Sequence, residues 1–188
     1  EFCVGEIHFR SGSSKSRLFF ENYFKKLNIW SLQDMFYREF FRSGNVFIYR
    51  IEGKVSPGDI KKINQTFGFE IKADEGELPI KFVVLNPADI HAHGSVSFTN
   101  ASYYKVLSGY ELEKLRNPRT PEDNEVLETL TPEDREKIKN KRAGTVFIEL
   151  NNKNIVAVFY KRQSYEIFAV SPIYPVLQDL NFRQELRL

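Results

Sequence analysis

Three side chains with the chemistry of metal ligands recur at alternate positions in the middle of the chain: Asp89, His91 and His93. Alternation along a β-strand would place all three on one face, and histidine is the commonest ligand for transition metals. Together with a bound water, such a set could support metal-assisted hydrolysis. An exposed polar strand or loop gives the same pattern, and the sequence offers no HExxH-type partner. We favour the polar strand or loop, and we expect no metal and no cofactor.

Cationic residues lie beside aromatic ones at Lys161 and Arg162, which fall between Tyr160 and Tyr165. Cations interleaved with rings can bind phosphates and stack on bases, so these two residues are candidates for contact with DNA or with a neighbouring subunit. Long cationic side chains that lie over apolar surface give the same pattern. The net charge of +2 excludes a strongly basic nucleic-acid binder as a description of the whole chain.

The sequence shows no pattern typical of nucleophilic or phosphate-transfer catalysis. It contains no glycine-rich phosphate-binding loop, and its serines next to glycine lack the strand–turn–helix order of a nucleophile elbow. The single cysteine, Cys3, excludes an internal disulfide. No apolar run approaches the roughly 20 residues of a membrane span. We therefore expect a protein that is not an enzyme and that has no membrane partner.

A helix that leads directly into a strand is the centre of the predicted fold. The helix is expected to begin at Ser31, whose hydroxyl can cap the first turn, and to end at Gly44. The following segment, 45–51, is rich in β-branched and aromatic residues and is predicted to be a buried strand. An earlier helix over 16–27 would form a hairpin with the Ser31 helix.

Further strands and a last helix follow from apolar runs and their punctuation. Strands are predicted at 69–72, 79–85, 95–98, 103–107, 145–150 and 155–160. Asn151 to Asn154 separates the last two strands, and because asparagine tolerates positive φ, this spacing predicts a β-hairpin. Ser171-Pro172 predicts the start of a C-terminal helix.

Charged residues dominate the segment 109–143. Thr120-Pro121-Glu122-Asp123 and Thr131-Pro132-Glu133-Asp134 each combine a capping threonine, a proline and two acids, which is typical of a helix start. We expect short charged helices here. A solvated surface insertion is the simpler interpretation, and a docking surface for a neighbouring subunit is the alternative.

Together these patterns predict a single α+β domain over residues 16–188, preceded by a flexible arm at 1–15. In this domain an N-terminal helical hairpin packs on a mixed, mostly antiparallel sheet. The charged helical insertion at 109–143 and a C-terminal helix complete it. A chain of this length can bury enough apolar surface to fold without a disulfide or a metal.

Three segments, in this order, resemble those of tailed-bacteriophage portal proteins, the ring-forming head–tail connectors. They are the helix that runs into Ser43-Gly44-Asn45-Val46-Phe47-Ile48-Tyr49-Arg50, the strand that ends in Val84-Leu85-Asn86-Pro87-Ala88-Asp89-Ile90, and the late strand pair followed by Ser171-Pro172-Ile173 and a helix. The resemblance spans most of residues 17–187 and corresponds to the wing region. In that family the channel-lining helices and the clip would follow Leu188, so we expect a wing-region fragment.

The resemblance implies a structural role. In that family the full chain assembles a ring, usually a dodecamer, at one capsid vertex, and double-stranded DNA is packaged and ejected through it. The implied partners are other copies of the chain, the terminase, the major capsid protein and the head–tail adaptor. The implied location is the virion, which is assembled in the host cytoplasm. A metal-dependent hydrolase that uses Asp89, His91 and His93 and a stand-alone nucleic-acid-binding domain are the alternative functions.

Overall fold

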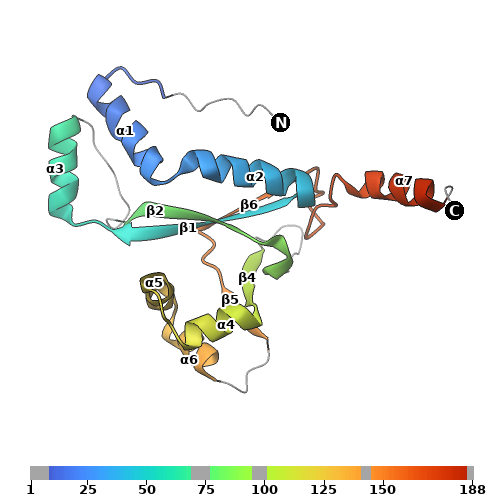
Figure 1. Cartoon of the computed structure of the whole chain (residues 1–188). Helices are drawn as coiled ribbons and strands as arrows, with labels where there is room; N and C mark the ends of the chain where they lie inside the picture. Colours follow the sequence, from blue (N-terminus) through green and yellow to red (C-terminus); the bar gives the residue numbers. More distant parts are fainter. Residues whose placement is uncertain (1–8, 69–76, 95–100, 141–144, 186–188) are drawn as a thin grey trace. The chain divides into compact units, whose positions relative to one another are not determined.

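The computed structural model of the chain is shown in Figure 1. The residues that the structure describes are 9–68, 77–94, 101–140 and 145–185. Contacts within the chain divide it into two compact units. Unit 1 comprises Glu1–Val84, Asn154–Arg162 and Phe168–Leu188, and unit 2 comprises Leu85–Lys153 and Gln163–Ile167. The strands predicted at 69–72 and 95–98, and residues 1–8 of the predicted arm, lie outside the described residues.

Unit 1 begins with the predicted pair of helices, α1 (Ser14–Lys26) and α2 (Ile29–Ser43). Helix α2 begins at Ile29 rather than at Ser31, because Asn28 adopts a left-handed conformation with φ 53° and the chain enters the new helix at once. Ser31 therefore lies inside α2 and does not cap it. Unit 1 also contains α3 (Pro57–Phe67) and α7 (Tyr174–Glu185).

The sheet of unit 1 has three strands in the order β2-β1-β6. They are β1 (Asn45–Lys54), β2 (Glu77–Leu85) and β6 (Ile155–Phe159). Strands β1 and β6 run antiparallel, with Asn45 opposite Phe159. Val46 and Phe47 are completely buried, and the Phe47 ring packs edge-to-face on Phe159 and Phe168. The strand predicted at 45–51 is confirmed, and its buried part is 45–47.

The start of β1 joins α2 to the segment that precedes α7. Gly44 ends α2 with φ 74°, a conformation that favours glycine, and a Cβ here would lie 3.1 Å from the Val170 carbonyl oxygen. The buried side chain of Asn45 donates hydrogen bonds to the carbonyl oxygens of Ser43 and Ala169 and accepts one from the Ala169 amide. Residues far apart in the sequence are therefore fixed together at this junction.

Unit 2 contains an antiparallel sheet in the order β3-β4-β5. Its elements are the short 3₁₀ helix η2 (Pro87–Asp89), strands β3 (Ile90–His93), β4 (Ser102–Leu107) and β5 (Val146–Glu149), and helices α4 (Gly109–Arg116), α5 (Pro121–Thr129) and α6 (Pro132–Lys139). Leu107, Val146 and Ile148 of the sheet pack with Leu112 of α4 and Ile138 of α6 in one buried cluster. One face of this sheet is therefore the core of unit 2.

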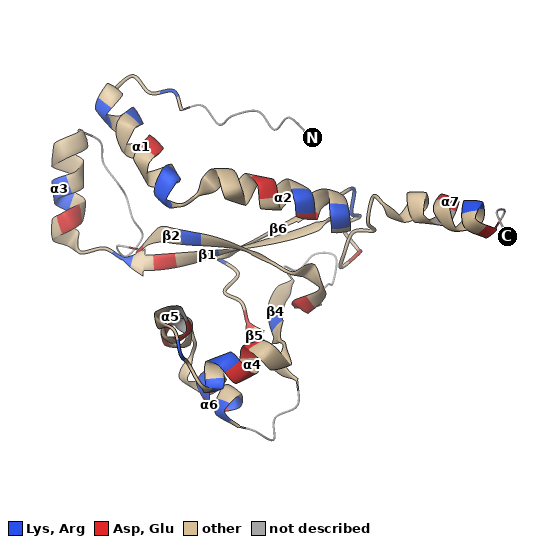
Figure 2. Cartoon of the chain, in the orientation of Figure 1, with Lys and Arg blue, Asp and Glu red and all other residues tan. Residues whose placement is uncertain are grey.

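The charged segment forms the helices that its cap signals predict. Thr120 and Thr131 each accept a hydrogen bond from the amide of the acid three residues later, Asp123 and Asp134. Figure 2 shows acidic and basic residues interspersed along α4 and α6, whereas the charged residues of α5 are all acidic. The segment is not only solvated surface, however, because Ile138 is completely buried in the core of unit 2.

The hairpin predicted between the last two strands is wrong. Strand β5 pairs with β4 in unit 2, whereas β6 pairs with β1 in unit 1. The residues between them, 151–154, do form a turn. Turn chemistry fixes a change of direction, but burial against distant residues decides which strand each arm pairs with. The α+β class, the N-terminal helical pair and the C-terminal helix are confirmed, with the strands divided between two antiparallel sheets.

Candidate functional site

The two histidines of the predicted metal set lie on β3 and face away from the core of unit 2. Ile90, at the start of β3, is buried, so alternation places His91 and His93 on the opposite, exposed face. The His91 ring packs edge-to-face on Phe147 with centroids 5.5 Å apart, and the His93 ring packs in the same way on Tyr104 at 5.3 Å. This face of the sheet therefore presents imidazoles beside aromatic rings.

Asp89 does not join the histidines. It ends η2, one position before β3, so the strand alternation does not extend to it. Its carboxylate accepts a hydrogen bond from Asn86 at 3.2 Å and lies 3.8 Å from the ammonium group of Lys105. Among the residues that the structure describes, no three histidine, cysteine or carboxylate side chains gather as a ligand set for a metal ion. The predicted common face of Asp89, His91 and His93 is not formed.

Lys105 links the sheet of unit 2 to helix α4. Its Nζ lies 2.9 Å from Oε1 of Glu111, and its side chain is only 19% exposed. The Glu111 carboxylate also accepts hydrogen bonds from the amide and the hydroxyl of Ser108, which completes a capping box. Burial opposes ionisation of Glu111, but the hydrogen bonds from Ser108 and Lys105 outweigh it and hold its pKa below the ordinary value. The cluster fixes the start of α4.

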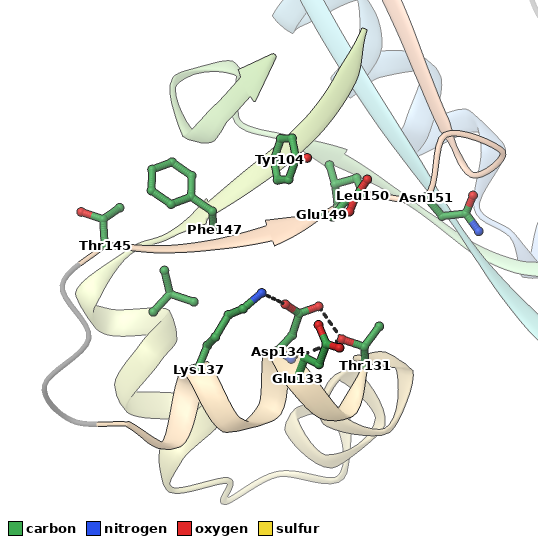
Figure 3. A pocket seen from close by; sticks show the side chains of 11 residues that line it. Tyr104, Thr131, Glu133, Asp134, Lys137, Thr145, Phe147, Glu149, Leu150 and Asn151 are labelled. Carbon is green, nitrogen blue, oxygen red and sulfur yellow. Dashed lines mark hydrogen bonds and ion pairs between the residues drawn. The ribbon is translucent and has the colours of Figure 1, made fainter. Parts of the chain in front are cut away.

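A hollow of about 690 Å³ lies in unit 2 beside β5 (Figure 3). Helix α6 contributes Asp134 and Lys137 to its lining. Asp134 is buried, accepts a hydrogen bond from the Thr131 hydroxyl at 2.8 Å and pairs with Lys137 at 2.8 Å. The hydrogen bond to Asp134 raises the pKa of Lys137 above its ordinary value. The Asp134 carboxylate and the Lys137 ammonium group therefore form an ion pair at the edge of the hollow.

Strand β5 and its neighbour β4 supply the other part of the lining. Glu149 and the rings of Phe147 and Tyr104 lie on this side, and Glu133 of α6 also borders the hollow. Carboxylates beside aromatic rings attract cations. The arrangement can therefore hold a positively charged group, but the Asp134 carboxylate already has its cation in Lys137. We assign no reaction to this hollow.

Lys161 and Arg162, the predicted contacts to DNA or to a subunit, follow β6 in unit 1. The Lys161 ammonium group lies 5.2 Å from the centre of the Tyr160 ring, and the Arg162 guanidinium lies 3.8 Å from that of Phe159. These are cation–π contacts. Both cations lie over aromatic rings, as expected if long cationic side chains cover apolar surface. Their contact with DNA or with a neighbouring subunit stays a prediction.

Two helices of unit 1 expose apolar surfaces that the sequence analysis did not single out. At and along α7, six apolar side chains are 40–62% exposed: Ile173, Tyr174, Val176, Leu177, Leu180 and Phe182. On α2, four are 37–41% exposed: Trp30, Met35, Tyr37 and Phe41. The sequence does contain a sign of these surfaces, because apolar residues lie on more than one side of both helices. A helix that packs on one side only needs apolar residues on that side alone.

No protein-family model matches the chain, and comparisons with curated proteins and with solved structures also found no match. Function is therefore inferred here from the residues and their arrangement. No helix in the described part of the chain combines the length and the apolar character that crossing a membrane requires.

Proposed function

We propose that this chain is a structural subunit that packs against copies of itself, in the manner of the wing region of a phage portal protein. The observation that carries the proposal is the exposed apolar surface of α2 and α7. Soluble monomers rarely expose a large contiguous apolar surface, and such surfaces mark contacts with other proteins. Neighbouring copies would remove this surface from water.

The segments that resemble portal proteins support the same proposal through the elements below, although the late strands β5 and β6 pair in different sheets. Helix α2 passes through Gly44 into β1. Strand β2 ends at Leu85, immediately before the Asn-Pro turn of η2. Ser171-Pro172 leads into α7.

In this proposal the chain is not an enzyme and uses no cofactor. It would form part of a ring at a capsid vertex of the virion, through which double-stranded DNA passes during packaging and ejection. The terminase, the major capsid protein and the head–tail adaptor would bind the ring. Lys161 and Arg162 would face the DNA or a neighbouring subunit.

Light scattering and negative-stain electron microscopy of the purified chain test the proposal. We expect rings or assemblies larger than a dimer, because α2 and α7 present different apolar faces to neighbouring copies. A protein that remains monomeric at about 100 µM would overturn the proposal.

The alternative functions make different predictions. A metal-dependent hydrolase would lose thermal stability when a chelator removes its metal. A stand-alone nucleic-acid-binding domain would bind DNA with an affinity that falls steeply as salt is added. We expect an unchanged melting temperature in EDTA and no salt-sensitive DNA binding by the isolated chain.

A further inference from the structure

Strand β5 ends its sheet with one side unpaired. The order β3-β4-β5 leaves β5 at the edge, so that β4 bonds to one side of it. The amide of Leu150 donates to the carbonyl oxygen of Tyr103, and hydrogen-bonded pairs alternate along an antiparallel ladder. The backbone groups of Ile148 therefore face β4, whereas those of Phe147 and Glu149 point away from it.

The unpaired side of β5 borders the hollow of about 690 Å³. Residues at alternate positions along this side all line it: Thr145, Phe147, Glu149 and Asn151. In the described part of the chain, no strand pairs with this side of β5. An unpaired strand edge beside open space is a template for a further strand.

The charged side chains around the hollow leave an excess of negative charge. Among the described lining residues, Glu133, Asp134 and Glu149 bring three carboxylates, and Lys137 brings one ammonium group. Figure 3 shows Asp134 and Lys137 pointing from α6 toward β5. After the hydrogen bond to Asp134, the charges of Glu133 and Glu149 also raise the pKa of Lys137, so both carboxylates lie near it. The hollow therefore attracts a positively charged partner.

The two faces of the sheet differ where they meet this edge. On the outer face, Glu149 lies opposite Tyr104, and the Phe147 ring is 41% exposed. On the core face, the buried side chains of Val146 and Leu150 border the hollow. Successive side chains of an added strand would alternate between these faces. A cation suits the positions beside Glu149 and the Phe147 ring, and an apolar residue suits the positions between them.

We propose that the free edge of β5 binds an extended segment of a partner protein, in which lysine or arginine alternates with apolar residues. The segment would add a strand to the sheet of unit 2, with its backbone bonded to Phe147 and Glu149. This inference does not rest on the proposed self-association, because β5 lies in unit 2, whereas α2 and α7 lie in unit 1.

A second copy of this chain is a poorer occupant of the edge. If β5 paired with β5, the carboxylates of Glu133, Asp134 and Glu149 from both copies would surround one space. Like charges that meet at an interface cost affinity. Strand β5 also spans only four residues, so the backbone hydrogen bonds are few and the charges must select the partner.

A designed peptide of about seven residues, in which lysine alternates with valine, is long enough to span β5. Fluorescence anisotropy measures its binding to the intact chain at low salt. We expect saturable binding, and we expect a matched peptide with glutamate in place of lysine to bind at least tenfold more weakly, because it adds negative charge to the hollow. No saturable binding at up to about 500 µM protein, or equal binding of the two peptides, would overturn the inference.

Two N-methylated forms of the lysine–valine peptide test the backbone pairing. One form carries its methyl groups on the lysine amides and the other on the valine amides. Successive amides point to opposite sides of a strand, so only one of the two sets can face β5. We expect one form to bind at least tenfold more weakly than the other, because it loses the hydrogen bonds to β5. Equal affinities of the two forms would show attraction between charges without strand pairing and would overturn the inference.

Substitutions in the chain test which carboxylates attract the peptide. We expect Glu133→Gln and Glu149→Gln each to weaken binding about threefold, and the double variant about tenfold. Glu136→Gln, on α6 but outside the lining of the hollow, is the matched control. Circular dichroism checks that each variant is folded. A folded double variant that binds the peptide as tightly as the control would overturn the inference.

Light scattering with and without the peptide separates this inference from the proposed function. If the chain is monomeric and binds the peptide, the β5 edge is a binding site and the proposed self-association is wrong. If the chain assembles and does not bind the peptide, the reverse holds. Dissociation of the assemblies by the peptide would show that β5 joins copies of the chain, and this would overturn the assignment of the edge to a different protein.

Discussion

Asn45 shows how a single buried side chain fixes the arrangement of unit 1. Its amide donates hydrogen bonds to the carbonyl oxygens of Ser43 and Ala169, at 2.9 Å each, and its oxygen accepts one from the Ala169 amide at 2.7 Å. If Ala169 moved away from Asn45, buried polar groups would lose their hydrogen bonds, and this would lower the stability of the fold. Asn45 therefore specifies where the late segment meets the start of β1.

Replacing Asn45 with alanine should lower the free energy of unfolding by about 3 kcal/mol, because the Ala169 amide and carbonyl lose their partners in a buried site. Asn45→Asp should destabilise similarly, since a carboxylate cannot donate to either carbonyl oxygen. Urea denaturation followed by circular dichroism measures both variants. Asn22→Ala, at an exposed position on α1, is the control. An Asn45→Ala protein as stable as this control would contradict the assignment.

Glu111 gives unit 2 a defined response to acid. Its folded pKa lies below the ordinary 4.5, so its contribution to stability is complete above about pH 4.5 and is lost as the pH falls through the lower folded value. We expect Glu111→Gln to lower the free energy of unfolding by roughly 0.5 kcal/mol near neutral pH. The difference from the unchanged protein should vanish at low pH.

Thermal melting of both proteins across a series of acidic buffers measures this effect. Glu136→Gln, an exposed position on α6, removes the same charge without the capping box. A pH-independent difference for Glu111→Gln would show that the loss comes from packing and not from ionisation.

At the scale of elements, the starts of the charged helices α5 and α6 were predictable, whereas the start of α2 and the strand partners were not. Thr120 and Thr131 cap the helices that the sequence predicts, because a cap acts on amides within the next three residues. The partners of β5 and β6 depend on β4 and β1, which are distant in the sequence. Likewise, strand alternation put His91 and His93 on one face, but η2 removed Asp89 from it.

The N-terminal cap of α6 should contribute more to the free energy of unfolding than the cap of α5. The Thr131 hydroxyl accepts from the Asp134 amide and donates to its buried carboxylate, so Thr131→Ala leaves that carboxylate with one partner fewer. We expect Thr131→Ala to lower the free energy of unfolding by about 2 kcal/mol and Thr120→Ala by about 1 kcal/mol. Urea denaturation compares them, with Thr131→Ser as the variant that retains the hydroxyl. Equal losses for the two alanine variants would contradict this order.

At the scale of the whole molecule, the chain between β2 and β6 passes through unit 2. These two strands flank β1 on either side. The sequence predicts one domain over 16–188, and no local pattern marks the boundaries at 84–85 and 153–154. The contacts that divide the chain into two units arise only when distant segments pair, so composition alone does not reveal them.

Replacing residues 86–153 with a flexible linker of about a dozen residues tests the independence of unit 1, since a linker of that length can join even parallel strands. We expect β1 and β6 to remain paired, because Val46 and Phe47 keep their burial within unit 1. Amide hydrogen exchange of β1 measures this. Rapid exchange along β1 in the shortened chain would instead favour the single domain that the sequence predicts.

The hydrogen bonds of Asn45 also bear on how the protein is made. Asn45 binds Ala169, which lies 124 residues later in the chain. At translation rates of roughly 5–20 residues per second, β1 would leave the ribosome about 6–25 s before that partner is synthesised. During this interval the apolar residues of β1 lack β6, and an unpaired strand edge is prone to aggregation. The nascent chain is thus expected to depend on chaperones for a good yield of soluble protein.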